Sequence, residues 1–130
     1  MTELPISKVR VMVYQPDGTC PSLPLVESPY YKTLVTGERK WFDRYKQEVL
    51  AEHSPHTFEQ ERSYARFINL GEKIIHQGFD PAPPRITFDE DGVTALDGQH
   101  RLAILLHTYG PELLLQVEDN QVMGIIKPEV

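Results

Sequence analysis

Apolar residues recur at helical spacing in two stretches of the second half of the chain. One stretch predicts a helix that Gly110 stops, with apolar positions at Leu102, Leu105, Leu106 and Tyr109. The other predicts a helix that Gly78 ends, with one face formed by Tyr64, Phe67, Ile68, Gly71, Ile74 and Ile75. Both patterns indicate amphipathic helices that pack against a core.

Short apolar or alternating runs predict strands around these two helices. We expect strands over residues 86–88, 93–96, 113–117 and 122–126, and an opening strand over residues 9–13. The tetrapeptide Asp89-Glu90-Asp91-Gly92 predicts a turn between two of them. This mixture of helices and strands predicts an α+β domain.

The first half of the chain has a weaker pattern. Prolines interrupt residues 19–29, where we expect an irregular covering segment, and residues 30–33 resemble a loop. Thr36 is the expected cap of a helix over about residues 38–51, which Ser54-Pro55 then breaks. Thr57 with Gln60 fits a capping box that opens the next helix.

Composition and charge argue against several classes of protein. At 130 residues the chain fits a single domain, and its formal net charge of −6 offers no broad electrostatic footprint for nucleic acid. No stretch has the apolar length of a membrane-spanning helix, and the first residues lack the pattern of a secretion signal. With a single cysteine, Cys20, we expect a cytoplasmic protein without a membrane partner.

The polar sequence Asp97-Gly98-Gln99-His100-Arg101 lies between a predicted strand and a predicted helix. At a helix start, free backbone N–H groups and the positive end of the helix dipole favour an anion. The guanidinium of Arg101 adds a fork suited to phosphate or carboxylate. Alternatively, Asp-Gly is an ordinary turn pair, Asp97 caps the helix, and Arg101 bridges to a surface carboxylate.

The order of these elements resembles the ParB/sulfiredoxin superfamily. The similarity covers residues 58–117 and includes the Asp-Gly-x-His-Arg motif of its small stand-alone members. This resemblance implies a mixed sheet with helices packed on it, and a loop that holds nucleotide phosphates. It also implies that the residues near phosphate and metal are Asp97, Gly98, Gln99, His100 and Arg101, with Asp97 as the metal ligand.

Two departures restrict what the resemblance implies. Gln99 stands where sulfiredoxins have their cysteine, which argues against sulfur chemistry, and the chain ends without the DNA-binding domain of partition proteins. Gly37-Glu38-Arg39-Lys40 is similar to the nucleotide box of partition proteins, but it follows a loop-like stretch instead of a strand. We interpret this second box as the start of a helix with an acid in its first turn.

The resulting hypothesis is a nucleotide- or phosphate-binding domain that acts as a small-molecule phosphotransferase, kinase-like, or as an NTPase. Its cofactors are a nucleotide (ATP, ADP or CTP) and Mg²⁺, and its acceptor is a small hydroxyl-bearing metabolite. Asp97 and His100 are the catalytic candidates in the motif, and Glu27 or Glu38 is the candidate base. The alternatives are a non-catalytic ligand-binding or regulatory module and a nucleic-acid-associated regulator. The oligomeric state stays open.

Two further pairs of residues each have a structural and a ligand-binding interpretation. Arg62 and Arg66 fall one turn apart on the predicted helix, where they form a solvated edge or reach a second anionic group. Tyr30 and Tyr31 pack in the core or stack on a base or sugar.

Overall fold

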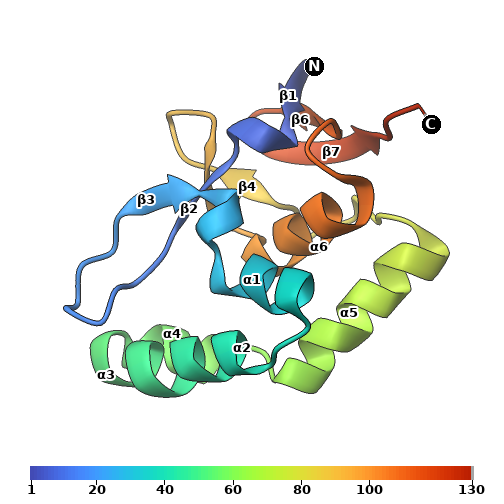
Figure 1. Cartoon of the computed structure of the whole chain (residues 1–130). Helices are drawn as coiled ribbons and strands as arrows, with labels where there is room; N and C mark the ends of the chain where they lie inside the picture. The colour runs from blue at the N-terminus through green and yellow to red at the C-terminus, as the bar shows by residue number, and fades with distance from the viewer. Residues whose placement is uncertain (130) are drawn as a thin grey trace.

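The computed structural model describes residues 1–129, across which the strands form one seven-stranded mixed sheet in the order β1-β6-β7-β4-β5-β2-β3 (Figure 1). The strands are β1 (Thr2–Pro5), β2 (Arg10–Met12), β3 (Ser22–Pro24), β4 (Thr87–Phe88), β5 (Thr94–Asp97), β6 (Leu114–Glu118) and β7 (Gln121–Ile126). Strands β2 and β5 run parallel, and the other neighbours run antiparallel. The α+β class and the mixed sheet are confirmed.

The helices gather on one side of this sheet (Figure 1). They are α1 (Pro29–Thr36), α2 (Lys40–Arg44), α3 (Ala51–His53), α4 (Pro55–Gln60), α5 (Tyr64–Gln77) and α6 (Gln99–Tyr109). A π-helical turn, η3 (Tyr45–Leu50), joins α2 to α3, and the short 3₁₀ turns are η1 (Ile6–Lys8) and η2 (Leu25–Glu27). None of the helices within residues 1–129 has the length and apolar character needed to cross a membrane.

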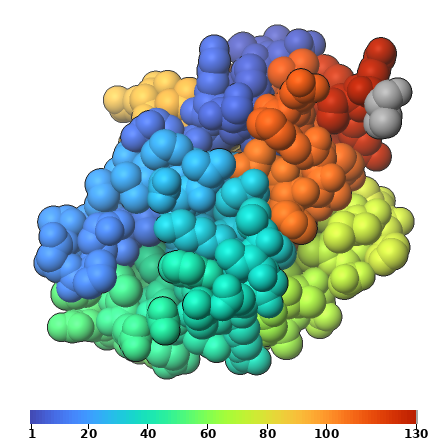
Figure 2. Space-filling model, in the orientation of Figure 1, coloured from blue at the N-terminus to red at the C-terminus, as the bar shows by residue number. Residues whose placement is uncertain are grey.

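Helix α6 is the centre of the core. Its five consecutive residues Leu102–Leu106 are all buried, so the helix is covered on several faces and not only on one stripe. It packs against both α1 and α5, and Figure 2 shows α1 and α6 meeting at the molecular surface. Because β5 leads directly into α6, the core fixes the position of the polar motif between them.

The structure corrects the expected loop at residues 30–33. These residues belong to α1, which Ser28 caps by accepting a hydrogen bond from the Tyr30 N–H at 3.2 Å and which has Pro29 in its first turn. Thr36 is the last residue of α1 and does not cap the next helix. Gly37 takes a left-handed conformation (φ 70°) and terminates α1. Pro29 therefore starts a helix at the end of a proline-rich segment that predicted irregular structure.

The proposed capping box at Thr57 and Gln60 is also wrong. Helix α4 has already begun at Pro55, while Ser63 caps α5 by accepting from the Arg66 N–H at 3.2 Å. Arg62 consequently lies before α5 and does not share a helical face with Arg66. Competing polar residues lie close together in this stretch, and tertiary packing selects which of them becomes the cap.

Two strands in the first half were not expected. β1 pairs with β6, and β3 pairs with β2 inside the segment that we expected to be irregular. Both are short strands at the ends of the sheet, so their sequences lack the longer alternation that predicts a strand.

Candidate functional site

A cleft of about 360 Å³ opens at the N-terminus of α6. It brings together β2, the end of β5, α1, the α4–α5 junction and the start of α6. Its lining residues are Met12, Tyr14, Tyr30, Tyr45, Thr57, Gln60, Glu61, Arg62, Leu70, Pro84, Leu96, Asp97, Gly98, Gln99, His100 and Arg101. All five residues of the polar motif therefore line a single cleft.

Gly98 makes the sharp turn from β5 into α6. Its φ of 94° is left-handed, and a Cβ added there would lie 2.6 Å from Cγ1 of Ile86, so only glycine fits. The Gly98 carbonyl accepts the first helical bond from the Leu102 N–H at 2.9 Å. The N–H groups of Gln99, His100 and Arg101 have no acceptor within residues 1–129 and form the open end of the helix.

Asp97 lies on the rim of the cleft with an exposed side chain. Its Oδ1 accepts a hydrogen bond from the Gly98 N–H at 2.8 Å, which fixes the turn. It is not the helix cap, because Gly98 occupies that position and no side chain caps α6.

Gln99 connects the start of α6 to the end of β2. Its Nε2 donates to the Met12 carbonyl at 2.9 Å, while its Oε1 is buried and has no hydrogen-bond partner among residues 1–129. A buried acceptor without a donor is costly, so a ligand or water that donates a hydrogen bond there would be favoured.

Two arginines, Arg62 and Arg101, line the same cleft. Across residues 1–129, neither guanidinium makes an ion pair or a hydrogen bond, although Arg101 is partly buried. Burial lowers the pKa of Arg101, the carboxylate of Asp97 opposes this, and the positive charge of Arg62 lowers the pKa further. Two guanidinium groups therefore face the cleft without a carboxylate counter-ion in contact.

A buried carboxylate, that of Glu61, also lines the cleft. Oε1 of Glu61 is 2.7 Å from Nε2 of His100, and the side chains are only 8% and 13% exposed. The Tyr30 hydroxyl donates to the other oxygen, Oε2. Glu61 thus joins α1 and α6 to the α4–α5 junction, where its neighbour Arg62 lies.

The protonation of this cluster follows from its contacts. Burial by itself raises the pKa of Glu61, but the hydrogen bond and charge of His100, together with the Tyr30 hydroxyl, bring it below its ordinary value. Burial and then the Glu61 carboxylate raise the pKa of Tyr30 well above its ordinary value. At neutral pH Glu61 is therefore an anion and Tyr30 a proton donor.

Aromatic rings enclose the imidazole of His100. Its ring centroid is 4.2 Å from that of Tyr30 and 4.9 Å from that of Phe67, both at steep interplanar angles. The imidazole is held from two sides while its Nε2 contacts Glu61. In this arrangement His100 positions the Glu61 carboxylate, and its Nε2 does not point freely into the cleft.

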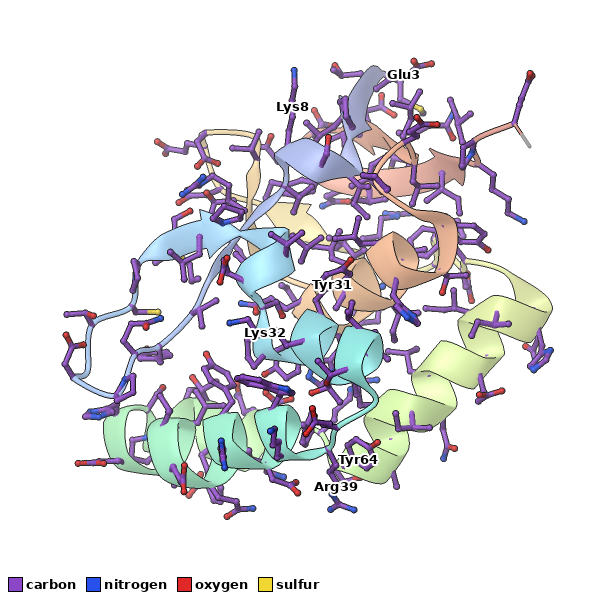
Figure 3. All side chains as sticks on the ribbon, in the orientation of Figure 1. Glu3, Lys8, Tyr31, Lys32, Arg39 and Tyr64 are labelled. Carbon is purple, nitrogen blue, oxygen red and sulfur yellow. The ribbon has the colours of Figure 1, made fainter. Side chains whose placement is uncertain are left out.

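The two candidate bases from the first half of the chain lie outside the cleft lining. Glu27 pairs with Lys32 at 3.4 Å, and Glu38 pairs with Lys40 at 2.9 Å, both on the exposed surface. The neighbouring Arg39 pairs with Asp43 and lies over the ring of Tyr64, 4.5 Å from its centroid (Figure 3). The second box thus forms surface contacts at the junction of α2 and α5.

Asp97 has few partners for holding a metal. Within residues 1–129, no three histidine, cysteine, aspartate or glutamate side chains form a group able to hold a metal ion. Mg²⁺ commonly uses one or two carboxylates and completes its shell with substrate phosphates and water. The exposed carboxylate of Asp97 fits a contact of that kind.

Sequence reasoning singled out the motif but missed Glu61. Glu61 is one of several charged residues between two short helices, and nothing in its spacing separates it from exposed Glu59. Arg62 was expected on a helix together with Arg66, but it lies before α5 begins. Only the packing of α1, α6 and the α4–α5 junction distinguishes these residues.

The hydrogen bond from Tyr30 leads to a testable expectation for stability. Tyr30→Phe removes the donor to a buried carboxylate and should lower the free energy of unfolding by about 1.5 kcal/mol, measured by urea titration. Tyr31→Phe is the matched control, because the Tyr31 hydroxyl makes no hydrogen bond within residues 1–129. Equal effects of the two substitutions would show that the Tyr30 hydroxyl does not hold Glu61.

The cleft thus combines an open helix N-terminus, two cations and a buried carboxylate that His100 and Tyr30 hold in place. This arrangement suits the binding of an anion beside a group that donates hydrogen bonds. Comparison of the chain with protein-family models, with curated proteins and with solved structures finds no match.

Proposed function

We propose that the cleft binds a phosphate-bearing ligand, a nucleotide, with the phosphate between Arg62, Arg101 and the start of α6. The observation that carries this proposal is the pair of arginines without a counter-ion in contact, beside three free N–H groups. An anion placed there offsets the repulsion between the two cations and satisfies the N–H groups at the same time.

The unpartnered Oε1 of Gln99 supports a ligand that also carries a donor. A hydroxyl or amino group of the ligand supplies this hydrogen bond. Nucleotides and small hydroxyl-bearing metabolites both fit this requirement. The uncharged half of the cleft, which includes Tyr14, Tyr45 and Thr57, suits the remainder of such a ligand.

The activity that we propose is phosphoryl transfer to a small hydroxyl-bearing acceptor, or nucleotide hydrolysis, in the cytoplasm. ATP, ADP or CTP is the nucleotide, and Mg²⁺ neutralises charge on its phosphates when bound. Arg101 and Arg62 hold phosphate, Gly98 allows the backbone to approach it, and Asp97 lies where a carboxylate contacts the metal or accepts a proton. The resemblance of the motif to the ParB/sulfiredoxin superfamily agrees with this proposal.

A binding module without turnover is the second candidate. The observation in its favour is the engagement of Glu61 by His100 and Tyr30, which leaves Asp97 as the other carboxylate of the lining. A base held in two strong contacts is a poor proton acceptor. Binding without chemistry therefore suits the same geometry.

Titration calorimetry with ATP, ADP and CTP in the presence of Mg²⁺ tests the binding. Arg101→Gln should weaken nucleotide affinity about 30-fold, since it removes charge-assisted hydrogen bonds worth about 2 kcal/mol. Arg62→Gln should weaken it about fivefold, because Arg62 is more exposed. Arg66→Gln is the control, since Arg66 is exposed on α5 and does not line the cleft.

Two outcomes contradict the binding proposal. The first is the absence of binding of any nucleotide or inorganic phosphate to the wild type at about 10 mM ligand. The second is equal affinity in the Arg101→Gln and Arg66→Gln variants.

Assays of phosphate release and of transfer to polyols and hydroxy acids separate the two candidate functions. Asp97→Asn should abolish turnover while retaining most nucleotide affinity, if the cleft is catalytic. Nucleotide binding without any turnover by the wild type favours the binding module.

A further inference from the structure

A second cavity, of about 200 Å³, adjoins the cleft. It lies between α5 and the loop from Gly78 to Pro84. Four residues line both cavities: Arg62, Leu70, Pro84 and Arg101. The two cavities therefore meet at the pair of arginines.

The walls of this cavity differ from those of the cleft. One wall is apolar and consists of Leu70, Ile74 and Phe79. Lys73 lies on the same helix, at the exposed edge of the cavity, and makes no ion pair within residues 1–129. An apolar wall beside a free ammonium group suits a ligand that has an apolar carbon skeleton and a carboxylate group.

The only carboxylate in the lining, Asp80, already has a structural role. Its Oδ1 accepts a hydrogen bond from the Ala82 N–H at 2.9 Å. The lining also contains three positively charged side chains, those of Lys73, Arg62 and Arg101. The cavity therefore has an excess of positive charge. An anionic ligand is therefore favoured there.

The loop from Gly78 to Pro84, which forms one side of the cavity, is preorganised by its own hydrogen bonds. Besides the turn at Asp80, Arg85 Nε donates to the Pro81 carbonyl at 3.0 Å, and the prolines of the loop restrict its backbone. A pocket that needs no reordering loses less free energy on binding.

We propose that this second cavity is a separate subsite for a small carboxylic acid with an apolar carbon body. Its carboxylate contacts Lys73, its carbon body packs on Leu70, Ile74 and Phe79, and the arginines separate it from the anion in the cleft. The volume lies below the ~300–1,000 Å³ of pockets for drug-sized ligands, which fits a small metabolite. The subsite goes beyond the proposed function and does not rest on it.

Phenylacetate is a suitable probe, and phenylacetamide is its uncharged counterpart. In ¹H–¹⁵N NMR titrations of the full chain, phenylacetate should shift the amides of Lys73, Gly78 and Phe79. Lys73→Gln should weaken phenylacetate binding about fivefold and Lys73→Glu more than tenfold, while phenylacetamide binding stays unchanged. Phe79→Ala should weaken both probes.

Lys8→Gln is the matched control, because Lys8 is an exposed lysine on η1 that does not line the second cavity and lies far from α5 (Figure 3). Lys8→Gln should leave phenylacetate affinity within about twofold of the wild type. Saturating ADP with Mg²⁺ should weaken phenylacetate binding without displacing it, since the two ligands occupy different cavities but share the charge of Arg62 and Arg101.

The outcomes separate this inference from the proposed function. Binding of phenylacetate that depends on Lys73, in a protein that binds no nucleotide, sustains the subsite and refutes the nucleotide proposal. Absence of phenylacetate binding at about 10 mM overturns the subsite. So does full displacement of phenylacetate by ADP, or equal phenylacetate affinity in the Lys73→Glu and Lys8→Gln variants.

Discussion

Glu61→Gln is expected to lower the free energy of unfolding by about 3 kcal/mol, because it removes a buried charged acceptor from two hydrogen bonds. The substitution leaves the His100 imidazole, 13% exposed, without the carboxylate that contacts its Nε2 at 2.7 Å. It also replaces the acceptor of the Tyr30 hydroxyl. Urea unfolding at pH 7 measures the change.

Glu59→Gln is the control for the loss of charge. Glu59 lies two residues away on α4 with an exposed side chain, and its neutralisation should change stability by less than about 0.5 kcal/mol. A loss equally small for Glu61→Gln would mean that the buried pair does not stabilise the fold.

The effect of Glu61→Gln should depend on pH. The pKa of Glu61 lies below its ordinary value in the folded protein, so the carboxylate contributes stability above its unfolded pKa of about 4.3. That contribution is lost as the pH falls through the folded pKa. The difference in stability between wild type and Glu61→Gln should therefore shrink towards acid pH, and a difference that stays constant down to pH ~3 would contradict the assigned charge state.

Gly98→Ala should destabilise the protein by about 3 kcal/mol. Part of this loss comes from a left-handed backbone that alanine adopts at a cost of about 1 kcal/mol, and the rest from overpacking, which typically costs 1–3 kcal/mol. The overpacking arises because the added Cβ meets Ile86, whose Cγ1 is 2.6 Å away and whose side chain is fully buried. Thermal or urea unfolding gives the size of the effect.

Gly37→Ala isolates the backbone part of this cost. Gly37 has a similar left-handed conformation (φ 70°), but nothing lies within 4 Å of an added Cβ, so we expect a loss of about 1 kcal/mol. Ile86→Ala should partly relieve the contact, so the double variant Ile86→Ala/Gly98→Ala should be more stable than the sum of its single changes by about 1 kcal/mol. Strict additivity would refute the contact between the two positions.

Much of the fold was predictable because its signals are local. Helices α5 and α6 carry apolar residues at helical spacing and end at glycines, and the Asp89–Gly92 turn and strands β5 to β7 appear within a few residues of their expected places. These elements follow from spacing along the chain, which the sequence shows directly.

The boundaries in the first half were not predictable to the same degree. Helix α1 begins at a Ser-Pro pair inside a proline-rich stretch, and the helix after Gly37 passes through the π-helical turn η3 before it ends at His53. Serine and threonine often cap helices, and this stretch contains Ser54, Thr57 and Ser63. Of these three, Ser63 caps α5. Local preference alone does not choose between such competing residues, because packing decides the outcome.

The sequence by itself determined the class of the fold and the helix start that presents Asp97-Gly98-Gln99-His100-Arg101. A glycine turn between a strand and an apolar helix is a local pattern, and so is its open N-terminus. Only the tertiary structure placed Arg62 beside Arg101, and Glu61 against His100 and Tyr30. These contacts join residues 31 to 39 positions apart, and no spacing along the chain encodes them, since burial against distant elements selects one glutamate and one arginine among many.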